Sequence, residues 1–283
     1  MKILVTGASG FMGSNICPIL EKNHLLFKPE REELDLFDRE SIKNYLLNNN
    51  IDAIVHFANP NPVKYVGIDT ADKMFEDSMR MFMNLYYLRD LYKKMIYIGS
   101  GAEYDKRFDI VNAKEDDVFK RMPVDSYGLA KHIANKLLLL SDNIYNCCVF
   151  GCYGPGDFKN KFITHCINCC KTSDKITIKQ DCKFDFLHVY DLGKYLLWML
   201  EHDLKYKMYN ASSGKHLYLS EIAKLVKEQM HSNLPIEILK DGLNLEYTAN
   251  GERLFRESGL RPEISIEEGI RIQIESQNND FGK

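Results

Sequence analysis

No stretch of about 18 consecutive apolar residues occurs in this chain, and no signal-peptide pattern precedes its first apolar segment. Basic tracts are also missing, and the formal net charge is −3, which gives no electrostatic case for binding nucleic acid. Internal repeats and low-complexity linkers are absent as well. We therefore expect a globular cytoplasmic protein that acts on neither membranes nor nucleic acids.

Disulfides and metals are not expected either, although the chain contains eight cysteines. In a cytoplasmic protein of this size, cysteines are usually free thiols. Cys166, Cys169 and Cys170 fall on one face of a predicted helix. Such a face is more often buried packing than a metal site. The sequence predicts no metal centre.

The first segment of the chain predicts a nucleotide-binding turn. Apolar and β-branched residues in 2–6 form a short buried strand, and Gly7, Gly10 and Gly13 then follow at intervals of three before a helix-like run to Leu20. Residues without side chains let the backbone approach a pyrophosphate, and the amides of a helix N-terminus hold its negative charge. This is the environment of a dinucleotide-binding βαβ unit.

The end of the second predicted strand, at residues 24–27, is the segment that selects the cofactor. In dinucleotide folds, an acidic residue here binds the ribose 2′-hydroxyl, and a basic residue accommodates the 2′-phosphate of NADP. Lys28 and Arg31 favour NADP, while Glu30 keeps NAD as the alternative. The competing interpretation is that these residues are only solvated turn charges.

Ser100, Tyr127 and Lys131 form the strongest chemical pattern in the sequence. Ser100 follows a predicted strand at 95–99, and Tyr127 and Lys131 lie one turn apart on a helix predicted to run to about residue 140. A neighbouring ammonium and a cationic nicotinamide favour the phenolate of a tyrosine, which brings its pKa toward the operating pH. In the reverse direction the phenol donates its proton to a carbonyl oxygen as hydride arrives at carbon, with Ser100 bonded to the same oxygen. The pattern predicts carbonyl reduction or the reverse oxidation.

The remaining elements predict an α/β fold, with a doubly wound parallel sheet of the Rossmann type and a smaller C-terminal substrate-binding domain. We place the dinucleotide-binding domain at 1–153, with a returning segment at about 185–211, and the substrate domain at 154–283. Helices are expected near 39–48, 72–93, 192–201, 220–230 and 266–275, and strands near 53–59, 146–150 and 235–239. Asp191 is expected to cap the helix at 192–201, and His188 to be a packed residue rather than a catalytic one.

Together these motifs resemble the extended short-chain dehydrogenase/reductases, the family of NAD-dependent sugar-nucleotide epimerases, dehydratases and reductases. The resemblance covers nearly the whole chain and rests on the glycine turn, on Asp35-Leu36, on 56–58, on 127–131, on 153–156 and on 186–189. It implies catalysis by Ser100, Tyr127 and Lys131, with Lys131 also bonded to the nicotinamide ribose. The cofactor-binding residues that it implies are Gly7, Ser9, Gly10, Phe11, Met12, Gly13, Lys28, Arg31, Asp35, Leu36, Phe57, Ala58, Asn59, Lys131 and Phe150. The substrate-binding candidates are Asn84, Glu103, Lys161 and Lys183.

Departures from the family pattern narrow the reaction. Gly101 and Ala102 stand where 4,6-dehydratases carry an Asp-Glu pair, so elimination of water has no acid and base. Ala102 and approximately Lys161 stand where GDP-fucose synthase carries the cysteine and histidine that invert two carbon centres. Phe184 stands where many members place an arginine against the substrate diphosphate, and Lys183 is the expected substitute.

Three functions remain open after these comparisons of motifs. The first is reduction of a 4-keto nucleotide sugar with NADPH, and the second is 4-epimerisation with a bound NAD. The third is a redox sensor without catalysis, against which the retained Tyr127 and Lys131 argue. The loops at 60–70, 104–125 and 158–184 are expected to select the sugar. Homodimerisation through the helices at 72–93 and 127–140 is implied by the resemblance alone.

Overall fold

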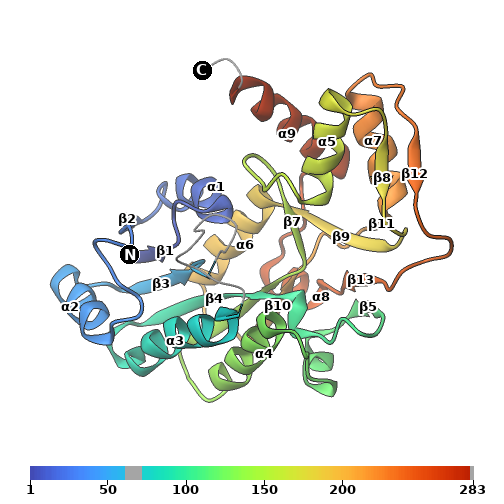
Figure 1. The fold of residues 1–283 in the computed structure, drawn as a ribbon. Helices are drawn as coiled ribbons and strands as arrows, with labels where there is room; N and C mark the ends of the chain where they lie inside the picture. The colour runs from blue at the N-terminus through green and yellow to red at the C-terminus, as the bar shows by residue number, and fades with distance from the viewer. Residues whose placement is uncertain (61–71, 281–283) are drawn as a thin grey trace.

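Six parallel strands form the first layer of the molecule (Figure 1). The computed structural model describes residues 1–60 and 72–280. The sheet has the order β2-β1-β3-β4-β6-β10, so the chain reverses direction across the sheet between β1 and β3. Ligands of open α/β sheets bind beyond the carboxyl ends of the strands at such a reversal. The strands are β1 (Lys2–Thr6), β2 (Leu25–Phe27), β3 (Ala53–His56), β4 (Lys94–Ser100), β6 (Ile144–Val149) and β10 (Met208–Ala211).

Helices cover both faces of this sheet because its strands are apolar on both sides. In β1, Ile3 and Val5 pack in the core beneath α1 and α6, and Leu4, between them, packs in the opposite core with α2, α3 and α4. This is the alternation that the twofold period of a strand produces. The helices are α1 (Phe11–Leu20), α2 (Arg39–Asn49), α3 (Met74–Tyr87), α4 (Ser126–Leu138) and α6 (Val189–Glu201). The predicted fold class is confirmed.

A second lobe lies beyond the carboxyl ends of the strands and carries its own core. Its main sheet has the order β11-β9-β13-β5, with β7 also paired to β9, and a separate parallel pair joins β12 to β8. The helices α5, α7 and α9 pack around Ile167, Ile222 and Ile270. The strands are β5 (Ile110–Ala113), β7 (Gly151–Tyr153), β8 (Ile176–Ile178), β9 (Lys183–His188), β11 (His216–Tyr218), β12 (Ile236–Ile238) and β13 (Tyr247–Ala249), and the helices are α5 (Phe162–Thr172), α7 (Leu219–Gln229), α8 (Glu252–Ser258) and α9 (Ile266–Asp280).

Segments from both sides of residue 153, where the predicted domains divide, contribute to each of the two main sheets. Within the segment 185–211, α6 and β10 pack in and pair with the first sheet, whereas β9 pairs in the second sheet. The strand β5, from the first half of the chain, also pairs there, with β13. These long-range pairings carry no local sequence signal.

The start of α6 differs from the prediction. His188 is the N-cap residue, and its Nδ1 accepts from the amide of Tyr190. Burial lowers the pKa of His188 to about 4, which keeps the ring neutral and able to accept. Asp191 lies within the first turn of the helix, where its carboxylate accepts from the amide of Ile264 and pairs with the Lys194 ammonium. The cap assigned to Asp191 was wrong because the helix begins three residues earlier than expected.

The loop, metal and membrane predictions can be compared with the structure only for the residues that it describes. Most of the loop predicted at 60–70 lies outside them. Among the described side chains, no group of three His, Cys, Asp or Glu is arranged to hold a metal ion, although His165 contacts the Cys169 thiol at 3.5 Å. Within the same ranges, no helix has both the length and the apolar composition needed to cross a bilayer.

Candidate functional site

The glycine turn between β1 and α1 has the geometry of a phosphate cradle. Gly7 has φ +71°, a conformation that side chains disfavour, and its carbonyl accepts from the amide of Gly10. A Cβ atom on Gly13 would lie 2.5 Å from the carbonyl oxygen of Gly7, so the helix start packs directly on the turn. The chain thus brings bare backbone and the N-terminus of α1 to one point, which fits a dinucleotide pyrophosphate.

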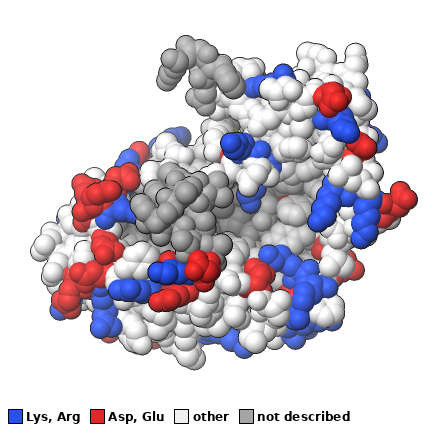
Figure 2. All heavy atoms as spheres, viewed as in Figure 1, with Lys and Arg blue, Asp and Glu red and all other residues white. Residues whose placement is uncertain are grey.

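This turn opens into a cavity of about 880 Å³ between the two lobes. Figure 2 shows the surface hollowed there, with Lys and Arg side chains around the hollow. The cavity is large enough for a dinucleotide and part of a second ligand. It is lined by nearly all of the residues that the resemblance assigned to the cofactor, namely Gly7, Ser9, Gly10, Phe11, Met12, Gly13, Arg31, Asp35, Leu36, Phe57, Ala58, Asn59, Lys131 and Phe150.

Lys28 is the exception among the predicted cofactor residues. Its ammonium binds the Glu21 carboxylate at 2.5 Å, and it does not line the cavity. Arg31 and Glu30 do line it, three and two residues further along the chain. The structure therefore does not bring Lys28 to the cavity, because its ammonium pairs with the Glu21 carboxylate that follows helix α1.

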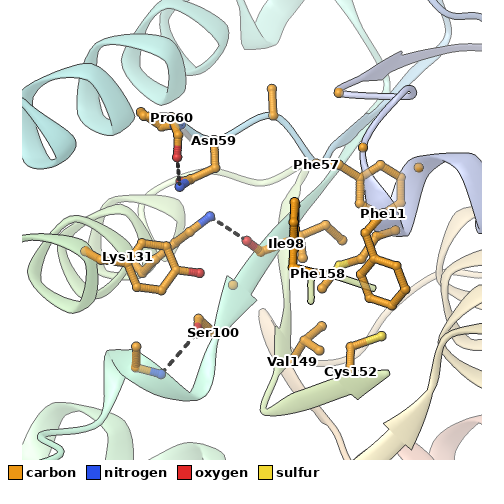
Figure 3. Close-up of a pocket in the computed structure, with 18 of the residues that line it drawn as sticks. Phe11, Phe57, Asn59, Pro60, Ile98, Ser100, Lys131, Val149, Cys152 and Phe158 are labelled. Carbon is orange, nitrogen blue, oxygen red and sulfur yellow. Dashed lines mark hydrogen bonds between the residues drawn. The ribbon is translucent and has the colours of Figure 1, made fainter. Parts of the chain in front are cut away.

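Ser100, Tyr127 and Lys131 converge on the inner end of the cavity. Ser100 ends β4, and α4 carries Tyr127 and Lys131 on the face toward that strand end. The Lys131 ammonium donates to the Ile98 carbonyl at 2.8 Å and lies 5.8 Å from the centre of the Tyr127 ring. In the close-up, Lys131 and Ser100 face a space that Val149, Cys152 and Phe158 border from the other side (Figure 3).

Burial controls the protonation of the tyrosine and lysine. It raises the pKa of Tyr127 to about 12, against a smaller lowering by its hydrogen bond with Ser100. Burial also lowers the pKa of Lys131 to about 8, while the carboxylate of Glu103 acts in the opposite direction. Sequence reasoning expected the Tyr127 pKa to fall toward neutrality, with a nicotinamide cation as one of the causes. The protein by itself holds the phenol protonated, which is the form that donates a proton to a carbonyl oxygen.

Glu103 does not reach the cavity, contrary to the prediction that it binds substrate. Its side chain is fully buried, and its carboxylate accepts from the amide of Ser100 and from the side chains of Asn135 and Asn146. The short 3₁₀ turn at Gly101–Glu103 sends this side chain inward beneath β4. Glu103 fixes the backbone of Ser100 from below.

The buried Glu103 makes the stability of the protein depend on pH. Burial raises its pKa to about 7 from an ordinary value of 4.5, so between these values the folded state binds more protons than the unfolded state. Stability then falls as pH rises through that window, by up to about 3 kcal/mol from this group. Glu103→Gln removes the charge, and when the side-chain amide of Asn135 turns over, its oxygen, which has no partner, can accept from the new amide group.

We expect the free energy of unfolding of Glu103→Gln to exceed that of the wild type by an amount that grows between pH 5 and pH 8. Urea unfolding of both proteins at these two pH values measures the free energies. Subtracting the wild-type value from that of the variant at each pH removes the contributions of the other titrating groups. Parallel pH dependences would contradict this role of Glu103.

Two other substrate-binding candidates also lie away from the cavity. Asn84, on α3, donates to the Leu36 carbonyl at 3.0 Å and so holds the segment that borders the cavity. Lys183 lies over the ring of Tyr218, and the next residue, Phe184, lines the cavity instead. Alternate residues of a strand face opposite sides, so Lys183 cannot replace the family arginine from this position. The fourth candidate, Lys161, does line the cavity.

Sequence reasoning missed several residues on the substrate side of the cavity. Lys106, Asp157 and Tyr247 line it. Burial raises the pKa of Asp157 to about 7. Asp157 follows the 153–156 motif closely enough to be found from sequence, but Tyr247 reaches the site only through the pairing of β13 with β5 and β9.

Comparison with known proteins agrees with this geometry. The model of the NAD dependent epimerase/dehydratase family matches residues 3–212, about three quarters of the chain. The chain belongs to this family. The prediction from sequence that the chain is an enzyme of an NAD-dependent family is thereby confirmed.

The relatives within the family include enzymes of nucleotide-sugar conversion. The chain is 23% identical over 310 residues to the GDP-L-colitose synthase of Yersinia pseudotuberculosis, with 99% of this chain and all of that protein covered. A GDP-L-fucose synthetase of Naegleria fowleri bound to NADP superposes with a TM-score of 0.85 at 16% identity, over all of this chain and 95% of that one. RMD of Pseudomonas aeruginosa, complexed with NADPH, gives 0.81 at 22% identity over 99% of both chains.

Proposed function

We propose that this protein of the epimerase/dehydratase family reduces the 4-keto group of a nucleotide sugar, using NADPH. The observation that carries the proposal is the convergence of Ser100, Tyr127 and Lys131 on one cavity that the glycine turn also lines. The cofactor, when bound, supplies hydride. Gly101 and Ala102 stand in place of the Asp-Glu pair of the dehydratases, and Ala102 and approximately Lys161 stand in place of the cysteine and histidine of GDP-fucose synthase.

Each of the three residues has a defined part in this reduction. Tyr127 transfers its phenolic proton to the carbonyl oxygen, and burial keeps that proton in place until the oxygen becomes basic. Ser100 donates a hydrogen bond to the same oxygen. Lys131, fixed by the Ile98 carbonyl, stabilises the tyrosinate that forms. Proton uptake from solvent restores Tyr127.

Reduction is distinguished from 4-epimerisation by the fate of the cofactor. The test mixes the purified protein and NADPH or NADH with a panel of GDP- and dTDP-4-keto-6-deoxyhexoses. We expect one NADPH to be consumed for each sugar that gains two hydrogens. An isomeric nucleotide sugar formed without net oxidation would establish the epimerase instead, and no conversion of any sugar would refute both.

Preference for NADPH over NADH is proposed to depend on Arg31. It lines the end of the cavity where β2 finishes, and a charge-assisted contact with the 2′-phosphate is worth about 1.5–3 kcal/mol. We expect Arg31→Gln to raise the dissociation constant of NADPH at least about tenfold and leave that of NADH unchanged. Fluorescence titration measures both constants. Lys28→Gln is the matched control, because Lys28 is paired outside the cavity. An equal loss of affinity for NADPH and NADH would show that Arg31 does not contact the 2′-phosphate.

We also propose that the protein forms a homodimer through α3 and α4. These helices lie side by side on one face of the sheet (Figure 1), and Tyr87, Leu139 and Leu140 expose apolar surface at their ends. Light scattering during size-exclusion chromatography measures the mass in solution. A monomer at micromolar concentration would refute this proposal.

A further inference from the structure

Tyr247 brings a second phenol to the catalytic end of the cavity. It starts β13 and pairs with Ile110 on one side and Phe184 on the other. Its ring is held between Phe150 and Phe184, each with its ring centre 4.9 Å away. Aromatic packing on both sides fixes the direction in which the hydroxyl points.

The hydroxyl of Tyr247 lies against the backbone that follows Ser100. A Cβ atom on Gly101 would be only 2.3 Å from the Tyr247 oxygen, so this phenol occupies the space that any side chain at residue 101 would need. Ser100, Tyr127 and Tyr247 line the same cavity, and the Ser100 hydroxyl lowers the pKa of both phenols against the larger effect of burial. The side chains of β4, α4 and β13 thus bring three hydroxyls to one end of the cavity.

The hydrogen-bonding capacity of a serine hydroxyl assigns directions to these contacts. It has one donor hydrogen and two acceptor lone pairs. The amide of Ala102 donates to the Ser100 oxygen at 3.1 Å and uses one lone pair. Donation from the Tyr247 hydroxyl to the second lone pair would fill both acceptor positions of Ser100. The single Ser100 hydrogen is then left to point toward the side where Tyr127 and the carbonyl oxygen of a substrate lie.

We propose that Tyr247 is a positioning residue, which donates its hydroxyl hydrogen to Ser100 and thereby aims the Ser100 hydrogen at the reacting oxygen. The inference deepens the proposed carbonyl reduction and rests on it. It also explains the glycine at residue 101, because the phenol replaces the side chain that the dehydratases carry there. A residue of the second lobe thereby orients the catalytic serine at the end of β4 in the six-stranded sheet.

Tyr247→Phe tests this role because it removes the hydroxyl and keeps the ring between Phe150 and Phe184. With the 4-keto sugar that the wild type reduces, we expect kcat to fall about tenfold or more and the KM values of sugar and NADPH to stay within about twofold. Tyr145→Phe is the matched control. It also loses a phenolic hydrogen bond, to the Asp142 carbonyl at 3.2 Å, but lies outside the cavity.

The double variant separates action through Ser100 from action elsewhere. If Tyr247 works by orienting Ser100, then Ser100→Ala/Tyr247→Phe will be no slower than Ser100→Ala alone. Multiplicative losses would overturn the proposal, as would an unchanged kcat in Tyr247→Phe or a loss confined to the KM of the sugar.

A titration without substrate keeps the inference independent of the proposed function. Donation from Ser100 favours the Tyr127 phenolate, so the phenolate absorbance of Tyr127 with oxidised NADP bound should appear at higher pH in Tyr247→Phe than in the wild type. Subtracting the spectrum of the matching Tyr127→Phe protein isolates this group. The substitution leaves in place the other ionisable groups that act on Tyr127, which are Lys131, Glu103, Cys148, Asp125 and Tyr97.

The two readouts fail in different ways. If no sugar of the panel is reduced but the Tyr127 titration moves as expected, the positioning role stands and the proposed substrate is wrong. If the wild type reduces a sugar and the titration does not move, Tyr247 does not orient Ser100.

Discussion

Replacing Tyr127 with phenylalanine should lower kcat by about 10²–10⁴-fold, the range typical for loss of a general acid. The reason is that Tyr127 lies one helical turn from Lys131, with the ammonium 5.8 Å from its ring centre, and burial keeps its proton in place for transfer to the carbonyl oxygen. Steady-state rates of NADPH oxidation measure the loss. The dissociation constant of NADPH should change little, because the glycine turn and the β2 end of the cavity are untouched.

The Tyr127→Phe protein keeps its ring and its packing, so its unfolding midpoint serves as the control for folding. A variant that folds and binds NADPH but retains the wild-type rate would exclude Tyr127 as the proton donor.

Replacing Gly13 with alanine should damage both the fold and cofactor binding. The added Cβ would lie 2.5–2.6 Å from backbone atoms of Gly7 and Ala8, which cannot rotate away as a side chain would. We expect the free energy of unfolding to fall by about 1–3 kcal/mol, with a loss of NADPH affinity of at least about tenfold as the amides of the turn shift. Urea unfolding and fluorescence titration measure the two effects.

Ser14→Ala is the neighbouring control for Gly13→Ala. Ser14 is exposed and bonds only within the first turn of α1, to the Phe11 carbonyl. Its substitution should leave NADPH affinity unchanged. Wild-type affinity in Gly13→Ala would mean that the turn does not hold the cofactor.

The parts of the molecule that sequence predicted well are those whose residues are close in the chain. The glycine turn is one strand, one turn and one helix, and Tyr127 and Lys131 are one helical turn apart, so local geometry is enough to place them. Ser100 could be added because the carboxyl ends of parallel strands meet at one edge.

The errors have a common physical origin in tertiary contacts. Glu103 was assigned to substrate, but Asn135 and Asn146, from α4 and β6, draw it beneath the sheet. Lys183 was assigned in place of Phe184, because the sequence does not reveal which face of β9 the cavity lies on. Tyr247 was missed because β13 enters the site through pairing with strands far away in the sequence.

The central claim is that hydride moves from NADPH to a sugar carbonyl carbon while Tyr127 protonates its oxygen. The most direct measurement uses NADPH with deuterium on the transferring carbon, a 4-keto nucleotide sugar that the wild type consumes, and mass and NMR analysis of the product. We predict one deuterium on the former carbonyl carbon for each NADPH oxidised, and no labelled product from Tyr127→Phe beyond its residual rate. Product without deuterium, or equal labelling by both proteins at the same rate, would contradict the claim.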